Sequence, residues 1–171
     1  MHRGKMEGDS REHLRRRYRP ARVRMLFVGE SPPASGRFFY QADSGLYRAM
    51  RRTFLRALPA LDGADFLQSF RECGCYLVDL CAKPVDRLTP QERRRACVVA
   101  EVGLSEAINV LRPKVMVVFL RSITPNVRRA AQLANWNGGL LELPYPGRWQ
   151  RHRVAFERAL LPVLRRELEK D

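Results

Sequence analysis

The chain has 171 residues, 45% of them hydrophobic, which suffices for one domain with its own core and excludes any need for disulfides or a metal to hold the fold. No apolar stretch approaches the ~20 residues of a bilayer span, and no apolar signal sequence follows the basic start, so we expect a soluble, cytoplasmic protein. The 32 Lys and Arg exceed the 18 Asp and Glu, giving a net charge of +14, which favours a polyanionic partner such as nucleic acid. A generally arginine-rich proteome is the alternative explanation.

The first half of the chain predicts an arm, a strand, a loop and a helix. Residues 1–22 form a basic block without apolar periodicity, so we expect a flexible arm or a frayed helix there, followed by a single domain over residues 23–171. The apolar run at about 24–28 predicts a buried strand that ends at Gly29. A loop rich in Pro, Gly and Ser follows, and a helix begins after Asp43 and Ser44.

The second half repeats this alternation. A strand is predicted at 75–80, and Thr89-Pro90-Gln91-Glu92 is a capping box that starts a helix ended by Pro113. Residues 114–120 predict the most apolar strand, Thr124-Pro125 starts another helix, and residues 140–143 predict a weaker strand before the last helix.

Four strands that alternate with helices predict an α/β fold, a three-layer α/β/α arrangement around a four-stranded parallel sheet. Ligands of such sheets bind at the carboxyl ends of the strands, so the loops that begin at Gly29, Leu80, Arg121 and Pro144 are the candidate site. The phosphate-loop, dinucleotide-binding and common zinc motifs are absent from the sequence.

The loop after the first strand, Gly29-Glu30-Ser31-Pro32, resembles the first motif of the iron-sulfur branch of the uracil-DNA glycosylase superfamily, although Pro33 departs from it. The stretch from Phe38 to Tyr47 is similar to the mismatch-specific uracil/thymine branch instead. The resemblance implies the strand order second, first, third, fourth, and an aromatic platform for the flipped base at Phe39 or Phe38. The alternative is that these aromatic side chains simply fill the core.

Two further motifs depart from the family. Asp79 stands at the end of the second strand, where the family has an Asn that reads the base, and a carboxylate donates a hydrogen bond only when it is protonated. Cys81 and Cys97 resemble two ligands of the iron-sulfur branch, but the two Cys that this branch carries before its first strand are missing. Because such a cluster needs four thiolates, we expect no metal and no cofactor, and small buried cysteines instead.

The last motif is Pro144-Tyr145-Pro146-Gly147, in which Tyr145 replaces the family's His and Gly147 its Ser. We expect the nearby His152 to be a solvated residue of the last helix. Arg148 and Trp149 resemble the wedge that fills the gap left by a flipped base, although Arg148 is equally explained as a solvated charge.

The resemblance implies a DNA glycosylase that flips and excises uracil or a related base, acting as a monomer without a membrane partner. A non-catalytic nucleic-acid-binding relative is the alternative. Glu30 would orient water, unless it only caps local amides, and Tyr145 would donate to the leaving base. The implied catalytic residues are Glu30 and Tyr145. The implied substrate-binding residues are Gly29, Ser31, Phe39, Tyr40 and Asp79. The implied DNA-binding residues are Arg37, Arg148 and Trp149.

Overall fold

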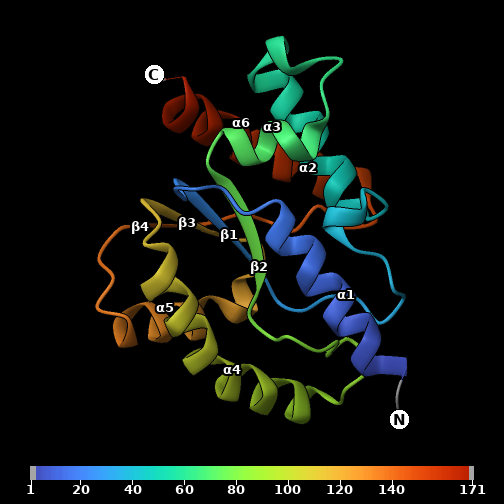
Figure 1. Ribbon diagram of the computed structural model, residues 1–171, viewed down its shortest axis with the longest axis vertical. Coiled ribbons are helices and arrows are strands. Elements are labelled where there is room, and N and C mark those ends of the chain that lie inside the picture. Colours follow the sequence, from blue (N-terminus) through green and yellow to red (C-terminus); the bar gives the residue numbers. More distant parts are fainter. Residues whose placement is uncertain (1–2, 170–171) are drawn as a thin grey trace. The chain divides into compact units, whose positions relative to one another are not determined.

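The computed structural model describes residues 3–169, and these contain a four-stranded sheet and six α-helices (Figure 1). The strands are β1 (Met25–Gly29), β2 (Cys75–Asp79), β3 (Val115–Val118) and β4 (Gly139–Glu142), and each neighbouring pair is parallel. The predicted α/β class is confirmed, and this set of elements is consistent with a three-layer α/β/α fold.

The helices are α1 (Arg3–Arg17), α2 (Gly45–Ala57), α3 (Phe66–Glu72), α4 (Pro90–Leu111), α5 (Thr124–Leu133) and α6 (Gln150–Leu168). The start signals act as the sequence predicts: the Ser44 hydroxyl accepts from the Tyr47 amide at 3.1 Å, and Thr89 and Glu92 form the capping box. Helix α3 was not predicted, although Asp65 caps it by accepting from the backbone amide of Leu67.

The strands lie in the order β2-β1-β3-β4, the order that the resemblance implies. After β1 the chain adds β2 on one side, and after β2 it crosses over to place β3 on the other side of β1. The connections that follow β1 and β3 therefore leave in opposite directions. Such a switch point leaves a crevice at the carboxyl ends of the two strands, which is where open parallel sheets bind their ligands.

The chain divides into two compact units, which are described separately. The sheet unit comprises residues 20–37 and 74–142, with all four strands, α4 and α5. Helices α4 and α5 pack against each other on one side of the sheet (Figure 1). Strands β1 and β3 are buried along their whole length, and the ring of Phe27 stacks against that of Phe119 with centroids 5.7 Å apart.

The helical unit comprises residues 3–19, 38–73 and 143–169, with α1, α2, α3 and α6. Helix α2 packs along α6, and the buried Glu157 of α6 accepts ion pairs from Arg52, at 3.0 Å, and from Arg56. The core of this unit is an aromatic cluster in which Phe54, Phe66 and Phe70 contact one another.

The N-terminal segment, expected to be a flexible arm or a frayed helix, is helical from Arg3 to Arg17. Glu12 pairs with Arg15 at 2.9 Å and with Arg16 at 3.1 Å, which supports this helix one turn before its end. The ring of Tyr18 then stacks on that of Tyr40 with centroids 5.7 Å apart. The mobility of residues 1–22 and the single domain over 23–171 stay predictions.

Candidate functional site

Glu30 lies directly after β1, with only 10% of its side chain exposed. Arg93 of α4 donates to both carboxylate oxygens, from Nε to Oε1 at 2.6 Å and from Nη2 to Oε2. These hydrogen bonds raise the pKa of the Arg93 guanidinium above its usual value. The carboxylate is therefore held in one orientation by a charge-assisted fork, which is the strongest common form of this contact.

Asp79 lies beside Gly29, its register partner across β1 and β2. A Cβ built at position 29 would be 2.8 Å from Asp79 Oδ1, so a glycine is needed there for the carboxylate to approach the strand. The Ser31 hydroxyl accepts from the Val85 amide at 3.2 Å, which ties the loop after β1 to the loop after β2. Gly29, Glu30, Ser31 and Asp79 are thus brought together at one edge of the sheet.

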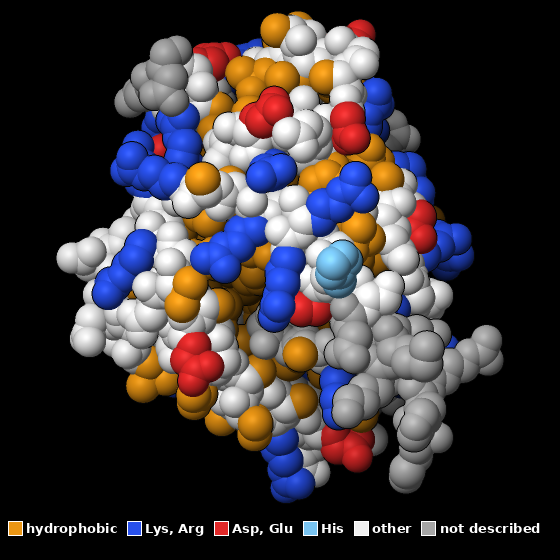
Figure 2. Space-filling model, in the orientation of Figure 1, with side chains coloured by type: hydrophobic (Ala, Val, Ile, Leu, Met, Phe, Trp, Pro, Cys, Tyr) orange, Lys and Arg blue, Asp and Glu red, His pale blue; other side chains and the backbone are white. Residues whose placement is uncertain are grey.

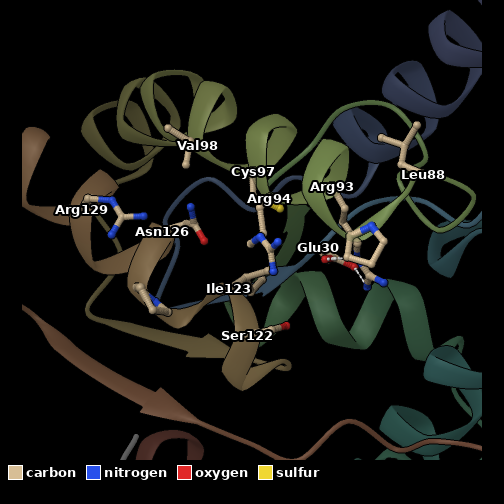
Figure 3. Close-up of a pocket in the computed structure, with 12 residues that line it drawn as sticks. Glu30, Leu88, Arg93, Arg94, Cys97, Val98, Ser122, Ile123, Asn126 and Arg129 are labelled. Carbon is tan, nitrogen blue, oxygen red and sulfur yellow. Dashed lines mark hydrogen bonds and ion pairs between the residues drawn. The ribbon is translucent and has the colours of Figure 1, made fainter.

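A cavity of about 490 Å³ opens beside Glu30 at the switch point, between α4 and the loop that leads from β3 into α5 (Figure 3). Its polar side chains include Glu30, Arg93, Arg94 and Arg129, and its apolar walls are formed by Leu88, Pro90, Val98, Ile123 and Pro125. This combination of apolar walls with a few polar groups, in this size range, is typical of small-ligand sites.

The α5 wall of the cavity is fixed by Glu101, a buried carboxylate of α4. Glu101 accepts from Asn126 Nδ2 at 2.6 Å, and from Arg129 Nε at 2.9 Å and Nη2 at 2.7 Å. The hydrogen bond from Arg129 lowers the pKa of the Glu101 carboxyl below its usual value, and the bond from Asn126 adds to this effect. Two carboxylates, Glu30 and Glu101, therefore hold two arginines of one cavity.

Cys81 and Cys97 are both buried, with their Sγ atoms 3.9 Å apart. Burial raises the pKa of the Cys81 thiol to about 12, and the neighbouring Cys97 adds to the effect. Within residues 3–169 no group of three or more His, Cys, Asp or Glu side chains is placed to hold a metal ion. The expectation of small buried cysteines agrees with this arrangement.

Phe39 and Tyr40 lie in the helical unit, 4% and 2% exposed. The ring of Phe39 meets those of Tyr40 and Phe70 with centroids 5.1 and 5.3 Å apart. This burial agrees with the alternative in which the aromatic side chains fill the core. The use of Phe39 as a platform for a base stays a prediction. It requires exposure of a ring face that neighbouring side chains of the helical unit cover.

The residues expected at the DNA-contacting rim are exposed. Arg37 and Arg148 are exposed, Trp149 is 62% exposed and Tyr145 is 45% exposed. Tyr145, Arg148 and Trp149 belong to the helical unit, whereas Arg37 belongs to the sheet unit. That Glu30, Phe39, Asp79 and Tyr145 line one cavity therefore stays a prediction.

His152 lies on α6, as expected, and its side chain is partly exposed. A Cβ at position 147 would lie 2.9 Å from His152 Nδ1, so the imidazole packs directly over the Gly147 backbone. A histidine side chain thus lies beside the loop of residues 144–149. The spacing of five residues between Gly147 and His152, which lies in the first turn of α6, was the only sequence signal for this contact.

Sequence reasoning also missed the cavity residues Arg93, Arg94, Asn126 and Arg129. Arginines on amphipathic helices are usually solvated charges, so a single sequence does not distinguish them from side chains that line a cavity. The available signal was the Arg93-Arg94-Arg95 triplet, which directly follows the capping box at residues 89–92.

Basic side chains are scattered over the face that Figure 2 shows. In the helical unit, α2 exposes Arg48, Arg51, Arg52 and Arg56, which recur at helical spacing on one face and line a shallow depression. Arg52 and Arg56 form ion pairs with Glu157, so part of the positive charge of this face is balanced. A face of this kind is suited to contacts with phosphate groups.

The comparisons with known proteins find no family model and no curated protein that matches this chain. Among residues 3–169, none of the helices is both long enough and apolar enough to cross a bilayer. The site therefore has to be interpreted from its own geometry.

Proposed function

We propose that the chain is a DNA glycosylase that flips uracil or a related damaged base out of DNA and hydrolyses its N-glycosidic bond, as its resemblance to the uracil-DNA glycosylase superfamily implies. The carrying observation is Glu30, whose carboxylate follows β1 at the switch point of a parallel sheet and lines a basic cavity. The net charge of +14 and the exposed arginines of α2 support DNA as the partner.

In the proposed reaction, Glu30 orients a water molecule and accepts its proton as the oxygen attacks C1′ of the deoxyribose. The C–N bond breaks, and its electron pair leaves with the base. The amides of residues 29–33 and the Tyr145 hydroxyl would stabilise the departing base, and Asp79 and Phe39 would contact it. Outside this site, Arg37, Arg148 and Trp149 would contact the strand.

A non-catalytic nucleic-acid-binding protein of the same fold is the second candidate, and one observation favours it. Both oxygens of Glu30 already accept hydrogen bonds from Arg93, so the carboxylate is engaged before any substrate or water binds. Asp79, where the resemblance implies an Asn, points the same way. For either candidate we propose a monomer that acts in the cytoplasm.

An excision assay separates the two candidates. The purified chain is incubated with labelled oligonucleotides that carry uracil, hypoxanthine or a thymine opposite guanine, in single and double strands, and abasic sites are cleaved by alkali and resolved on a gel. A glycosylase produces cleaved product from at least one damaged strand and none from the undamaged control. Binding of all the strands without any cleavage would reject the enzyme and leave the second candidate.

A further inference from the structure

Three guanidinium groups face one cavity of the sheet unit. Arg93 and Arg94 come from α4 and Arg129 from α5, and all three line the cavity beside Glu30 (Figure 3). They differ in their partners. Arg93 is held by Glu30 and Arg129 by Glu101, whereas Arg94 has no ion-pair partner in the described part of the chain.

Glu30 and Glu101 prepare Arg93 and Arg129 for an anion. A guanidinium has five N–H donors, and Glu30 and Glu101 each engage two nitrogens of their arginine, Nε and Nη2. The other donors are held in place by a side chain that has already lost its rotamer freedom, so a ligand that accepts from them costs less entropy. Two of the three arginines of the cavity are therefore pre-organised.

The charge balance selects an anion. The three arginines carry +3, and the two carboxylates that hold Arg93 and Arg129 carry −2, which leaves +1 before any ligand binds. Helix α5 begins at this wall, and its N-terminus lacks a capping side chain, because Ile123 occupies the N-cap position. The partial positive charge of the helix end adds to that of the arginines.

The walls select the rest of the ligand. A bare phosphate ion would leave most of the roughly 490 Å³ unfilled, and Leu88, Val98 and Ile123 offer it no partner. An anion that carries a flat, largely apolar body would use both parts of the cavity, with its charge on the guanidiniums and its body on the apolar side chains and the faces of the arginines. A nucleotide supplies the charge through its phosphate and the flat body through its base, whose two faces are apolar.

We propose that the cavity between α4 and α5 binds a phosphate monoester that carries a nucleobase, either as a free nucleoside monophosphate or as the 5′-terminal nucleotide of a strand. Arg94 supplies the free charge, and Arg93 and Arg129 supply the positioned donors. Because this binding does not require bond cleavage, it stands apart from the proposed excision. A chain that binds the nucleotide and excises nothing would reject only the proposed function, and one that excises without such binding would reject only this site.

The test is isothermal titration of the full chain with deoxyuridine 5′-monophosphate, deoxyuridine, and a trinucleotide with and without a 5′-phosphate. The monophosphate is expected to bind about tenfold or more tightly than the nucleoside, because only the monophosphate offers a charged acceptor. Tighter binding of the phosphorylated trinucleotide than of the monophosphate would identify a strand end as the ligand, and the reverse order a free nucleotide. Both orders support the site.

Arg94→Ala is the decisive variant, because Arg94 has no ion pair within residues 3–169 whose loss would disturb the fold, and unchanged thermal unfolding of the variant checks this point. It should weaken binding of the monophosphate about tenfold. Arg95→Ala, which removes an exposed neighbour outside the cavity lining, should leave binding unchanged. Equal affinities of the Arg94→Ala and Arg95→Ala variants, or equal binding of nucleoside and monophosphate, would overturn the proposal.

Discussion

The pairing of Glu30 with Arg93 is the most informative contact at the scale of single residues. It fixes the carboxylate at the end of β1, and it also takes up both of the oxygens that a catalytic base would use. In the glycosylase account Arg93 is a positioning residue, which holds the Glu30 carboxylate in a defined orientation. In the non-catalytic account the same pair is only a partly buried ion pair.

Arg93→Gln distinguishes these roles. If Arg93 positions Glu30, the variant should lower kcat for excision about tenfold to a hundredfold, with little change in KM, since the strand does not depend on this contact for binding. Steady-state kinetics on the best substrate of the excision assay measure both constants, and Arg95→Gln is the matched control on α4. An unchanged kcat would contradict the positioning role.

Burial of Cys81 predicts an unreactive thiol. With its pKa raised to about 12, only about one molecule in ten thousand carries the reactive thiolate at pH 8, and this fraction grows only as pH rises toward the pKa. Iodoacetamide labelling followed by mass spectrometry should therefore modify the partly exposed Cys73 well before Cys81. Equal labelling rates of Cys73 and Cys81 in the native protein would contradict the burial of the Cys81 thiol.

At the scale of elements, Glu101 joins α4 to α5 through Asn126 and Arg129. Its folded-state pKa lies below the unfolded one, so its ionised form stabilises the fold above about pH 4.5, and this contribution disappears as pH falls below that value. Glu101→Gln should lower the free energy of unfolding by about 1 to 2 kcal/mol near neutral pH, and by progressively less toward about pH 3.

Urea unfolding of the wild type and of Glu101→Gln at several pH values measures this difference. Glu106→Gln, an exposed position on the same helix, is the control and should show no such trend. A difference between Glu101→Gln and wild type that stays constant with pH would mean that the carboxylate is not the group responsible.

The elements show what sequence can predict. Local signals placed α2 and α4, because Ser44 and the box of Thr89 and Glu92 satisfy backbone amides within one turn. The apolar runs placed β1 to β4 to within about two residues. Helix α3 was not predicted, because seven residues give too little periodicity. Its packing also depends on aromatic partners such as Phe39 that are distant in sequence.

The candidate site was less predictable than the fold. Glu30 and Asp79 follow from the rule that strand ends share an edge. Arg93 and Arg129 do not, because the faces of α4 and α5 that meet at the cavity are set by how the two helices pack. The contact of His152 with Gly147 likewise depends on the turn between a loop and a helix, which no local pattern specifies.

At the scale of the whole molecule, the net charge of +14 predicts DNA affinity that is mainly electrostatic. Log K for duplex should fall with log salt concentration with a slope of about −0.9 for each phosphate contacted. Arg148→Ala should weaken binding to uracil-containing and normal strands alike and reduce this slope. Fluorescence anisotropy across a salt series measures the affinities and the slope, and salt-independent binding would contradict DNA as the partner.

The central claim is that Glu30 performs base excision, and a single-turnover measurement on the full chain tests it most directly. Glu30→Gln keeps the size of the side chain but cannot accept the proton, and Glu106→Gln removes an exposed carboxylate of α4 as the control. We predict that Glu30→Gln slows excision of the preferred base by about a hundredfold to ten-thousandfold with unchanged DNA binding. Equal excision rates in the Glu30→Gln and Glu106→Gln variants would contradict the account.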